Sequence, residues 1–93
     1  MIETEFSILV IDDEDIIRET FQEVLQDAGY LVRVAENSSE ALNILRQEHF
    51  DILLVDYNLP DMNGVDFIKE ASEIGNATKA PYIHKRSGFA EVQ

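Results

Sequence analysis

The chain has 93 residues, of which 45% are hydrophobic and 28% charged, and this composition indicates one small globular domain with a modest core. No apolar run approaches the roughly 18 residues that span a membrane, and there is no cysteine for a disulfide or a thiolate metal site. Seven basic against nineteen acidic residues give a net charge of -12, which disfavours direct binding to nucleic acid and favours cations or basic protein surfaces. Residues 1–5 lack the positive start and apolar stretch of a secretory signal, so we expect a cytoplasmic protein.

The first segment has the pattern of a buried strand followed by an amphipathic helix. Residues 6–11 form an apolar run that stops at Asp12 and Asp13, as expected of a strand buried on both faces. Residues 16–28 predict a helix, and Gly29 can supply its left-handed stop. The apolar positions of this helix recur at three- and four-residue spacing: Ile17, Phe21, Val24, Leu25 and Ala28.

A second strand and helix follow. Residues 30–35 are β-branched and aromatic enough for a strand. Asn37, with Glu40 three residues later, resembles a capping box that opens a helix through Leu45. The predicted apolar face consists of Ala41, Leu42 and Leu45.

The third unit begins at residues 52–55, an apolar run too short for a helix, which ends on Asp56. The loop 58–64 carries Pro60 and Gly64 as breakers before another helix. The apolar face of that helix is predicted to include Val65, Ile68, Ala71 and Ile74.

Strand and helix alternate three times without an internal repeat, which predicts βαβ units and a parallel sheet with helices on both faces. Residues 80–83 begin as a fourth strand, but His84-Lys85-Arg86 then replaces the apolar residues that a buried strand requires. We therefore expect an α/β core over residues 1–78 and a divergent segment over residues 79–93, either a degenerate fourth strand or a tail.

Two of the apolar strands end on aspartate. Ligand sites in open parallel sheets lie at the carboxyl ends of the strands, so we expect Asp12, Asp13 and Asp56 to meet there. Close carboxylates repel one another unless a cation neutralises them, and oxygen ligands without His or Cys favour Mg²⁺. Asp56, alone on the central strand, is the best-placed nucleophile for taking a phosphoryl group as an acyl phosphate.

Other interpretations of these acids fit less well. An EF-hand calcium loop would place Ile17 at a ligand position and has no glycine at its turn. A phosphatase with an aspartyl-phosphate intermediate usually has an Asp-x-Asp pair, whereas Asp12 is followed two residues on by Glu14. Acids that only cap helices and face water are common singly, but two apolar strands ending in Asp at matching positions argue for a site.

Over residues 6–71 the chain resembles the receiver domain of two-component response regulators. The resemblance rests on the apolar strand ending in Asp12-Asp13-Glu14 and on the run Ile52-Leu53-Leu54-Val55-Asp56-Tyr57-Asn58-Leu59-Pro60-Asp61-Met62-Asn63-Gly64. It implies a doubly wound, flavodoxin-like α/β fold, here incomplete with about four strands and three helices. It also implies a signalling phosphoacceptor rather than an enzyme, with at most Mg²⁺-dependent self-phosphorylation and dephosphorylation.

The resemblance further implies roles for individual residues. Asp12 and Asp13 would hold Mg²⁺, and Asp56 would be phosphorylated by a histidine kinase or a phosphotransfer protein. The backbone carbonyl of Asn58 would complete the metal shell. The loop residues with a structural role would be Leu59, Pro60 and Gly64, and His49 and His84 match nothing in the family site.

The end of the chain departs from the family pattern, which continues with a strand ending in Thr or Ser and a later strand ending in Lys. Ser87 is the nearest candidate for that switch residue, whereas Lys79 and Lys85 lie in the wrong part of the chain to match the Lys. The interpretations open for residues 79–93 are an interaction arm, an artificial chain end, or the product of a truncated or frameshifted gene. Without the family's final helix, we expect the sheet face beside the 16–28 helix to be partly bare and to be covered in a homodimer or strand-exchanged assembly.

Two functions follow. The first is a phosphorylation switch that signals to an output protein by protein contact. The second is a truncated receiver that keeps the acidic pocket but serves as a binding or dimerisation module without phosphorylation.

Overall fold

The computed structural model describes residues 6–74 and 80–84, and four strands alternate in it with three helices. The elements in chain order are β1 (Ser7–Ile11), α1 (Asp15–Asp27), β2 (Leu31–Ala35), α2 (Ser38–Gln47), β3 (Ile52–Asp56), α3 (Gly64–Ser72) and β4 (Ala80–His84). All strand pairs are parallel and the strand order is β2-β1-β3-β4. The expected doubly wound α/β sheet is confirmed, and its fourth strand extends to His84.

The register of the sheet brings the ends of its central strands together. Ile11 pairs with Ala35 on one side and with Val55 on the other. The residues that follow this pair are Asp12 and Asp56, so both leave the sheet at the same edge. The backbone N–H of Asp12 continues the ladder by donating to the carbonyl of Ala35, at 3.1 Å.

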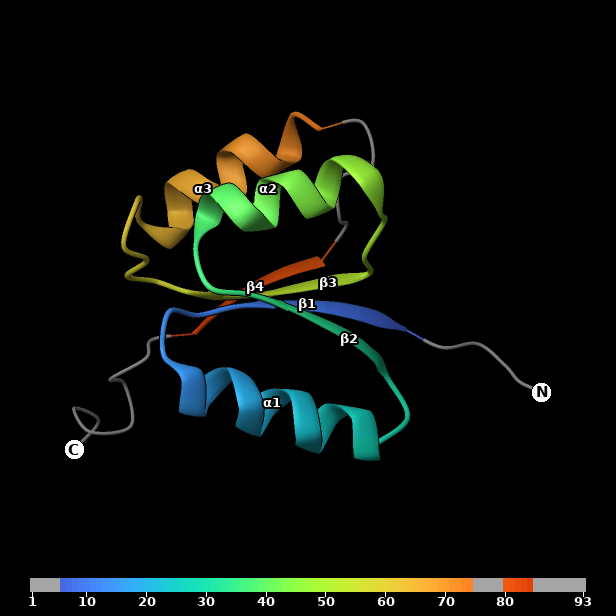
Figure 1. The fold of residues 1–93 in the computed structure, drawn as a ribbon. Helices are drawn as coiled ribbons and strands as arrows, with labels where there is room; N and C mark the ends of the chain where they lie inside the picture. The colour runs from blue at the N-terminus through green and yellow to red at the C-terminus, as the bar shows by residue number, and fades with distance from the viewer. Residues whose placement is uncertain (1–5, 75–79, 85–93) are drawn as a thin grey trace.

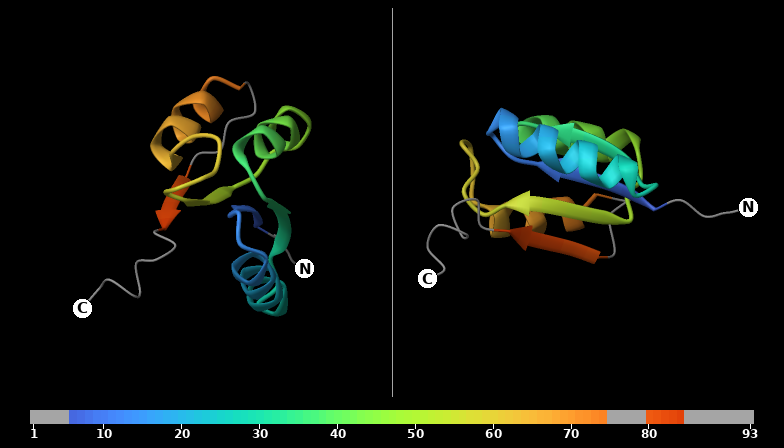
Figure 2. Two further views of the ribbon diagram at one scale, coloured as in Figure 1. Left: turned by 60° about the vertical axis from the view of Figure 1, so that its left-hand side comes forward. Right: turned by 90° about the horizontal axis from the view of Figure 1, so that it is seen from below.

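The helices cover the two faces of the sheet unequally. α2 and α3 lie on one face, and among the described residues α1 alone lies on the other (Figure 1; Figure 2). The main apolar core lies under α2 and α3: Leu9, Ile11, Ala35, Ala41, Leu42, Leu45, Phe50, Leu53, Val55, Leu59, Phe67 and Ala71. No residue of α1 is fully buried.

The predicted apolar face of α1 is therefore only partly correct. Ile17, Phe21 and Leu25 are half-buried, whereas Val24 is 57% exposed and Ala28 is also exposed. Only a narrow stripe of the α1 surface packs on β1 and β2, because no other helix of the described residues lies beside α1 on this face. Within the described residues, no helix is long and apolar enough to cross a bilayer.

The predicted residues at the end of α1 and at the start of α2 are confirmed in their main features. Gly29 has φ +100°, a left-handed conformation that favours glycine after α1. The Asn37 side chain accepts the Glu40 N–H at 2.8 Å and so caps α2. The Glu40 carboxylate, however, accepts from the N–H of Glu36 rather than from that of Asn37, so the capping box is shifted by one residue.

The predicted face of α3 is wrong at one position. Val65 is 42% exposed, whereas Phe67, absent from the prediction, is fully buried with Ala71. Val65 and Phe67 are separated by about 200° around a helix, so only one of them can face the sheet. Ile74 lies beyond the end of the helix but still packs against the core.

Candidate functional site

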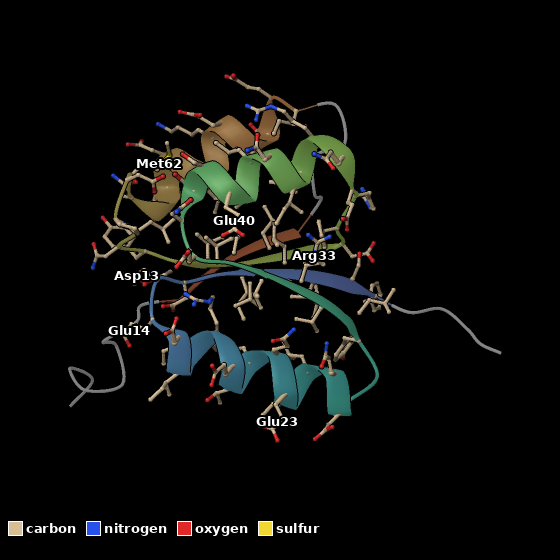
Figure 3. The ribbon with its side chains drawn as sticks, viewed as in Figure 1. Asp13, Glu14, Glu23, Arg33, Glu40 and Met62 are labelled. Atoms are coloured by element: carbon tan, nitrogen blue, oxygen red, sulfur yellow. The ribbon has the colours of Figure 1, made fainter. Side chains whose placement is uncertain are left out.

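Three aspartates meet at the edge of the sheet where the strands end. Carboxylate oxygens of Asp12, Asp13 and Asp56 all lie within 4.8 Å of one another. Asp12 and Asp56 are fully buried, whereas Asp13 is exposed in the loop between β1 and α1 (Figure 3). The structure thus brings together the three acids that the sequence predicts to converge.

Local turns orient the two buried carboxylates. Asp12 Oδ1 accepts the N–H of Glu14 at 2.9 Å, and Asp56 Oδ1 accepts the N–H of Asn58 at 3.1 Å. In each case a strand-end aspartate bonds to the backbone two residues on, which is the usual turn formed by this side chain. The plane of each carboxylate is therefore fixed by its own loop.

A basic side chain, which the sequence analysis did not single out, borders this cluster. Arg18, on α1, donates from Nη1 to the backbone carbonyl of Asp12 at 2.8 Å and pairs through Nη2 with Asp15. Its side chain is mostly buried, unlike that of Asp15. The three-residue spacing of Asp15 and Arg18 signals their ion pair, but the bond to Asp12 depends on how the loop folds back.

The loop between β3 and α3 is closed upon itself. Asn58 and Asn63 form an antiparallel bridge, and the Gly64 N–H donates to the carbonyl of Tyr57 at 2.7 Å. A Cβ atom on Gly64 would lie 2.9 Å from the Asp56 carbonyl oxygen and 3.1 Å from Tyr57 Cα. Glycine is needed here because two backbone segments approach closely, not because of its φ angle.

The same loop is bonded to α2 through Asp61, which the sequence analysis also missed. Asp61 Oδ1 accepts the N–H of Ser38 at 3.1 Å, and Oδ2 accepts the N–H of Ser39 at 3.1 Å. Partial desolvation opposes ionisation of Asp61, but the hydrogen bonds from Ser38 and Ser39 outweigh it and lower its pKa. No sequence spacing signals this contact, because it joins loops from two different βα units.

Other predicted residues lie elsewhere. Ser87, Lys79 and Lys85 lie outside the described residues. His49 is at the opposite end of the sheet, where its Nε2 is 3.6 Å from Asp51 Oδ1.

A hollow of about 640 Å³ lies at that opposite end of the sheet, away from the acids. Its lining residues are Ser7, Gln26, Tyr30, Leu31, Val32, Arg33, Glu48, His49 and Phe50. The three carboxylates converge at the acid cluster and not in this hollow, and a surface edge of that kind suits hydrated Mg²⁺ and a phosphoryl group.

The acid cluster has the chemistry of a magnesium site. The cluster offers carboxylate oxygens from Asp12, Asp13 and Asp56, and oxygen ligands are those that Mg²⁺ prefers. Two of the three carboxylates are fully buried, and buried charges in proteins are usually paired or bound to metal. The residues present therefore fit a divalent hard cation.

Comparison with known proteins agrees with this geometry. A response regulator receiver protein from Anaeromyxobacter sp. (strain Fw109-5) is 37% identical over 75 residues, which cover 81% of this chain and 32% of that protein. The response regulator receiver protein CpdR from Brucella abortus (strain 2308) is 34% identical over 85 residues, 91% of this chain and 68% of CpdR. The chain thus spans about a third of the first relative and two thirds of the second.

Solved structures have the same fold. The chemotaxis response regulator CheY4 of Vibrio cholerae superposes with a TM-score of 0.77 at 30% identity, covering 96% of this chain and 77% of that one. A Burkholderia pseudomallei response regulator, solved with a phosphorylated aspartic acid, a calcium ion and citrate, superposes with a TM-score of 0.75 at 29% identity, covering 85% of this chain and 47% of that one. The family model of the response regulator receiver domain matches residues 8–85. The chain therefore belongs to the response regulator receiver domain family.

Proposed function

We propose that this receiver domain accepts a phosphoryl group on Asp56 from the phosphohistidine of a histidine kinase or phosphotransfer protein. Receiver domains are signalling modules that interact with histidine kinases and output domains. The observation that carries the proposal for this chain is the convergence of Asp12, Asp13 and Asp56, with the ends of β1 and β3 in register. Asp56 is the member of the cluster on β3, beside the closed loop that ends at Gly64.

Mg²⁺ would be held by Asp12, Asp13, Asp56 and the backbone carbonyl of Asn58. When bound, it would shield the charge of the carboxylates from the incoming phosphoryl oxygens. Asp12 and Asp56 are buried, and the exposed Asp13 leaves one side of the site open to the donor.

The contribution of this chain to the transfer itself is a correctly oriented nucleophile. A carboxylate oxygen of Asp56 forms a bond to phosphorus while the P–N bond of the phosphohistidine breaks, and the imidazole leaves with the bonding electrons and takes up a proton. The Asn58 N–H on Oδ1 holds the carboxylate plane through this step. The product is an acyl phosphate on Asp56.

The related Burkholderia protein supports this chemistry, because it was solved with both a phosphorylated aspartic acid and a divalent cation. We place the output of this chain in contacts with another protein, since its net charge of -12 repels nucleic acid. A working switch would also need a hydroxyl residue, for which Ser87 remains the candidate.

The test is phosphorylation from a small donor. Incubation with Mg²⁺ and acetyl phosphate should add one base-labile phosphate, seen by intact-mass spectrometry, and EDTA should prevent it. Asp56→Asn should abolish the increment, whereas Asp66→Asn, an exposed acid on α3, should keep it. A wild-type protein that gains no phosphate while folded would refute the proposal.

The alternative is a binding or dimerisation module, and one observation bears on it. Ile52 and Leu54 of β3 are only half-buried on the α1 face, and Ile16 on α1 is 72% exposed. A second copy packed on this face would cover these apolar side chains, so in this alternative we propose a homodimer whose formation does not depend on phosphorylation. Light scattering at tens of micromolar tests it, and a monomer at that concentration would contradict it.

A further inference from the structure

Asp61 forms a bridge between the proposed phosphoacceptor loop and α2. Both of its carboxylate oxygens are used: Oδ1 accepts from the Ser38 N–H, and Oδ2 accepts from the Ser39 N–H and lies 3.2 Å from the Ser39 Oγ, which donates to it. These partners are distant in sequence, so the bridge joins two βα units rather than closing a local turn. We infer that Asp61 is a positioning residue that sets where the loop holds Asn58 against the metal site, an inference that rests on the proposed function.

At α2, the bridge ends on backbone N–H groups that favour a carboxylate as their partner. The first N–H groups of a helix have no partner within the helix, and the helix dipole favours negative charge there. Asn37 takes the N–H of Glu40, and Asp61 takes the N–H groups of Ser38 and Ser39. The two side chains therefore accept hydrogen bonds from different N–H groups at the start of α2, and Asp61 does not duplicate the cap formed by Asn37.

The α2 end of the bridge is firmly held. Ala41, Leu42 and Leu45 of this helix are buried in the core, and Ser38 itself is 1% exposed. Asp61 is itself exposed, so the bridge is a polar link between the fixed helix α2 and the outer part of the loop. Of the neighbouring loop residues, Leu59 is buried and Met62 is half-buried against the core, so the bridge adds to the hold that apolar packing gives this loop.

The loop end of the bridge lies close to the site. Asn58 donates to Asp56 and pairs with Asn63, so the loop is fixed at its base by backbone contacts. Asp61 lies between Asn58 and Asn63, and its bonds to α2 hold the outer part. With both parts held, the backbone at Asn58 has little freedom, which would lower the entropy lost when its carbonyl binds Mg²⁺.

The experiment measures Mg²⁺ affinity in three variants by isothermal titration calorimetry. Asp61→Ala removes both acceptors, Asp61→Asn keeps one oxygen, and Asp66→Asn removes one exposed negative charge of the same loop–helix region without touching the bridge. We expect about a tenfold higher Kd for Asp61→Ala, as is usual when a partner behind a metal ligand is lost. Asp61→Asn should lose less, and Asp66→Asn should stay within about twofold because exposed charges are screened.

A second measurement separates positioning from stability. The phosphorylation rate of Asp61→Ala with acetyl phosphate should recover to within about twofold of wild type at saturating Mg²⁺, since the turn that joins the Asn58 N–H to Asp56 is local and forms without the bridge. Amide hydrogen exchange of Ser38 and Ser39 should accelerate in the metal-free variant, which reports loss of the bridge in a folded protein.

The outcomes are distinguishable. If Asp61→Ala is folded, loses the amide protection and still binds Mg²⁺ as tightly as Asp66→Asn, Asp61 only caps α2 and the inference is overturned. If wild-type protein binds no Mg²⁺, the proposed function fails and this inference fails with it.

Discussion

Replacing Gly64 by alanine tests whether the close approach at the start of α3 matters for both stability and phosphorylation. The added Cβ would lie 2.9 Å from the Asp56 carbonyl oxygen and 3.1 Å from Tyr57 Cα, closer than such atoms normally approach. Its third neighbour, Val55 Cγ1 at 3.4 Å, is in ordinary contact. The strain therefore falls on the backbone of the proposed phosphoacceptor and not on a side chain that can turn away.

The expected change in the free energy of unfolding follows from two opposing contributions. Inserting a methyl group into a packed site costs about 1 to 3 kcal/mol, while replacing glycine by alanine in a helix returns up to about 1 kcal/mol. We expect the free energy of unfolding to fall by about 1 to 2 kcal/mol, which lowers Tm by about 5 to 10 °C in a domain of this size. A shift of a few tenths of an ångström at Asp56 should also slow phosphorylation by about threefold to tenfold.

The matched control is Gly29→Ala. Gly29 has φ +100° and no atom within 4 Å of a built Cβ, so alanine there is strained by its backbone conformation alone. That strain costs about 1 kcal/mol or more, far from the acids. Thermal unfolding and the acetyl phosphate assay should show both variants destabilised but only Gly64→Ala slowed. Equal phosphorylation rates in the two variants would refute the reasoning.

Three further predictions concern the core, the metal and pH. Phe67→Ala should lower the free energy of unfolding by about 3 to 5 kcal/mol in urea titrations, whereas Val65→Ala should change it by less than about 0.5 kcal/mol, because only Phe67 is buried. Mg²⁺ at one hundred times its Kd should stabilise the wild type by about 2.7 kcal/mol, seen as a higher Tm that EDTA reverses and Asp13→Asn weakens. The backbone hydrogen bond from Ser7, with smaller help from its hydroxyl and from His49, lowers the pKa of Asp51 against opposing desolvation. The pKa of Asp51 in the folded state lies below the unfolded value of about 3.9, so wild type should be more stable than Asp51→Asn above about pH 4. The difference in Tm between the two proteins should vanish as pH falls through the folded-state pKa. A difference in Tm that persists at the lowest pH would contradict an ionic origin.

Sequence reasoning succeeded where one strand or helix carries its own signal. Apolar runs that stop at Asp12 and Asp56 are strands, and their shared direction in a parallel sheet brings the two acids to one edge. Gly29 and Asn37 end and start helices through local backbone geometry, so they too could be predicted. The roles of the acids in binding metal and phosphate remain a proposal.

Sequence reasoning failed where the outcome depends on contacts between units. Val65 and Phe67 are both apolar, and only the docking of α3 on the sheet decides which one is buried. The bonds of Asp61 to α2 and of Arg18 to the Asp12 carbonyl join segments whose distance in space no spacing predicts. Polar groups at loop ends can choose among many partners, so their pairing is set by the assembled fold.

The burial of Asp12 and Asp56 connects the stability of this domain with its proposed chemistry. Burying a carboxylate is costly unless hydrogen bonds or a cation compensate, and the turn N–H groups of Glu14 and Asn58 each supply one such bond. A domain of this size is stable by only about 5 to 14 kcal/mol, so a gain of about 2.7 kcal/mol from a bound cation is a sizeable fraction of the free energy of unfolding. Adding a phosphoryl group to Asp56 changes the charge at the point where the two central strands end and the β3–α3 loop begins. In the proposed function, that loop and its Asp61 bridge to α2 are therefore the elements through which phosphorylation can reach the rest of the fold.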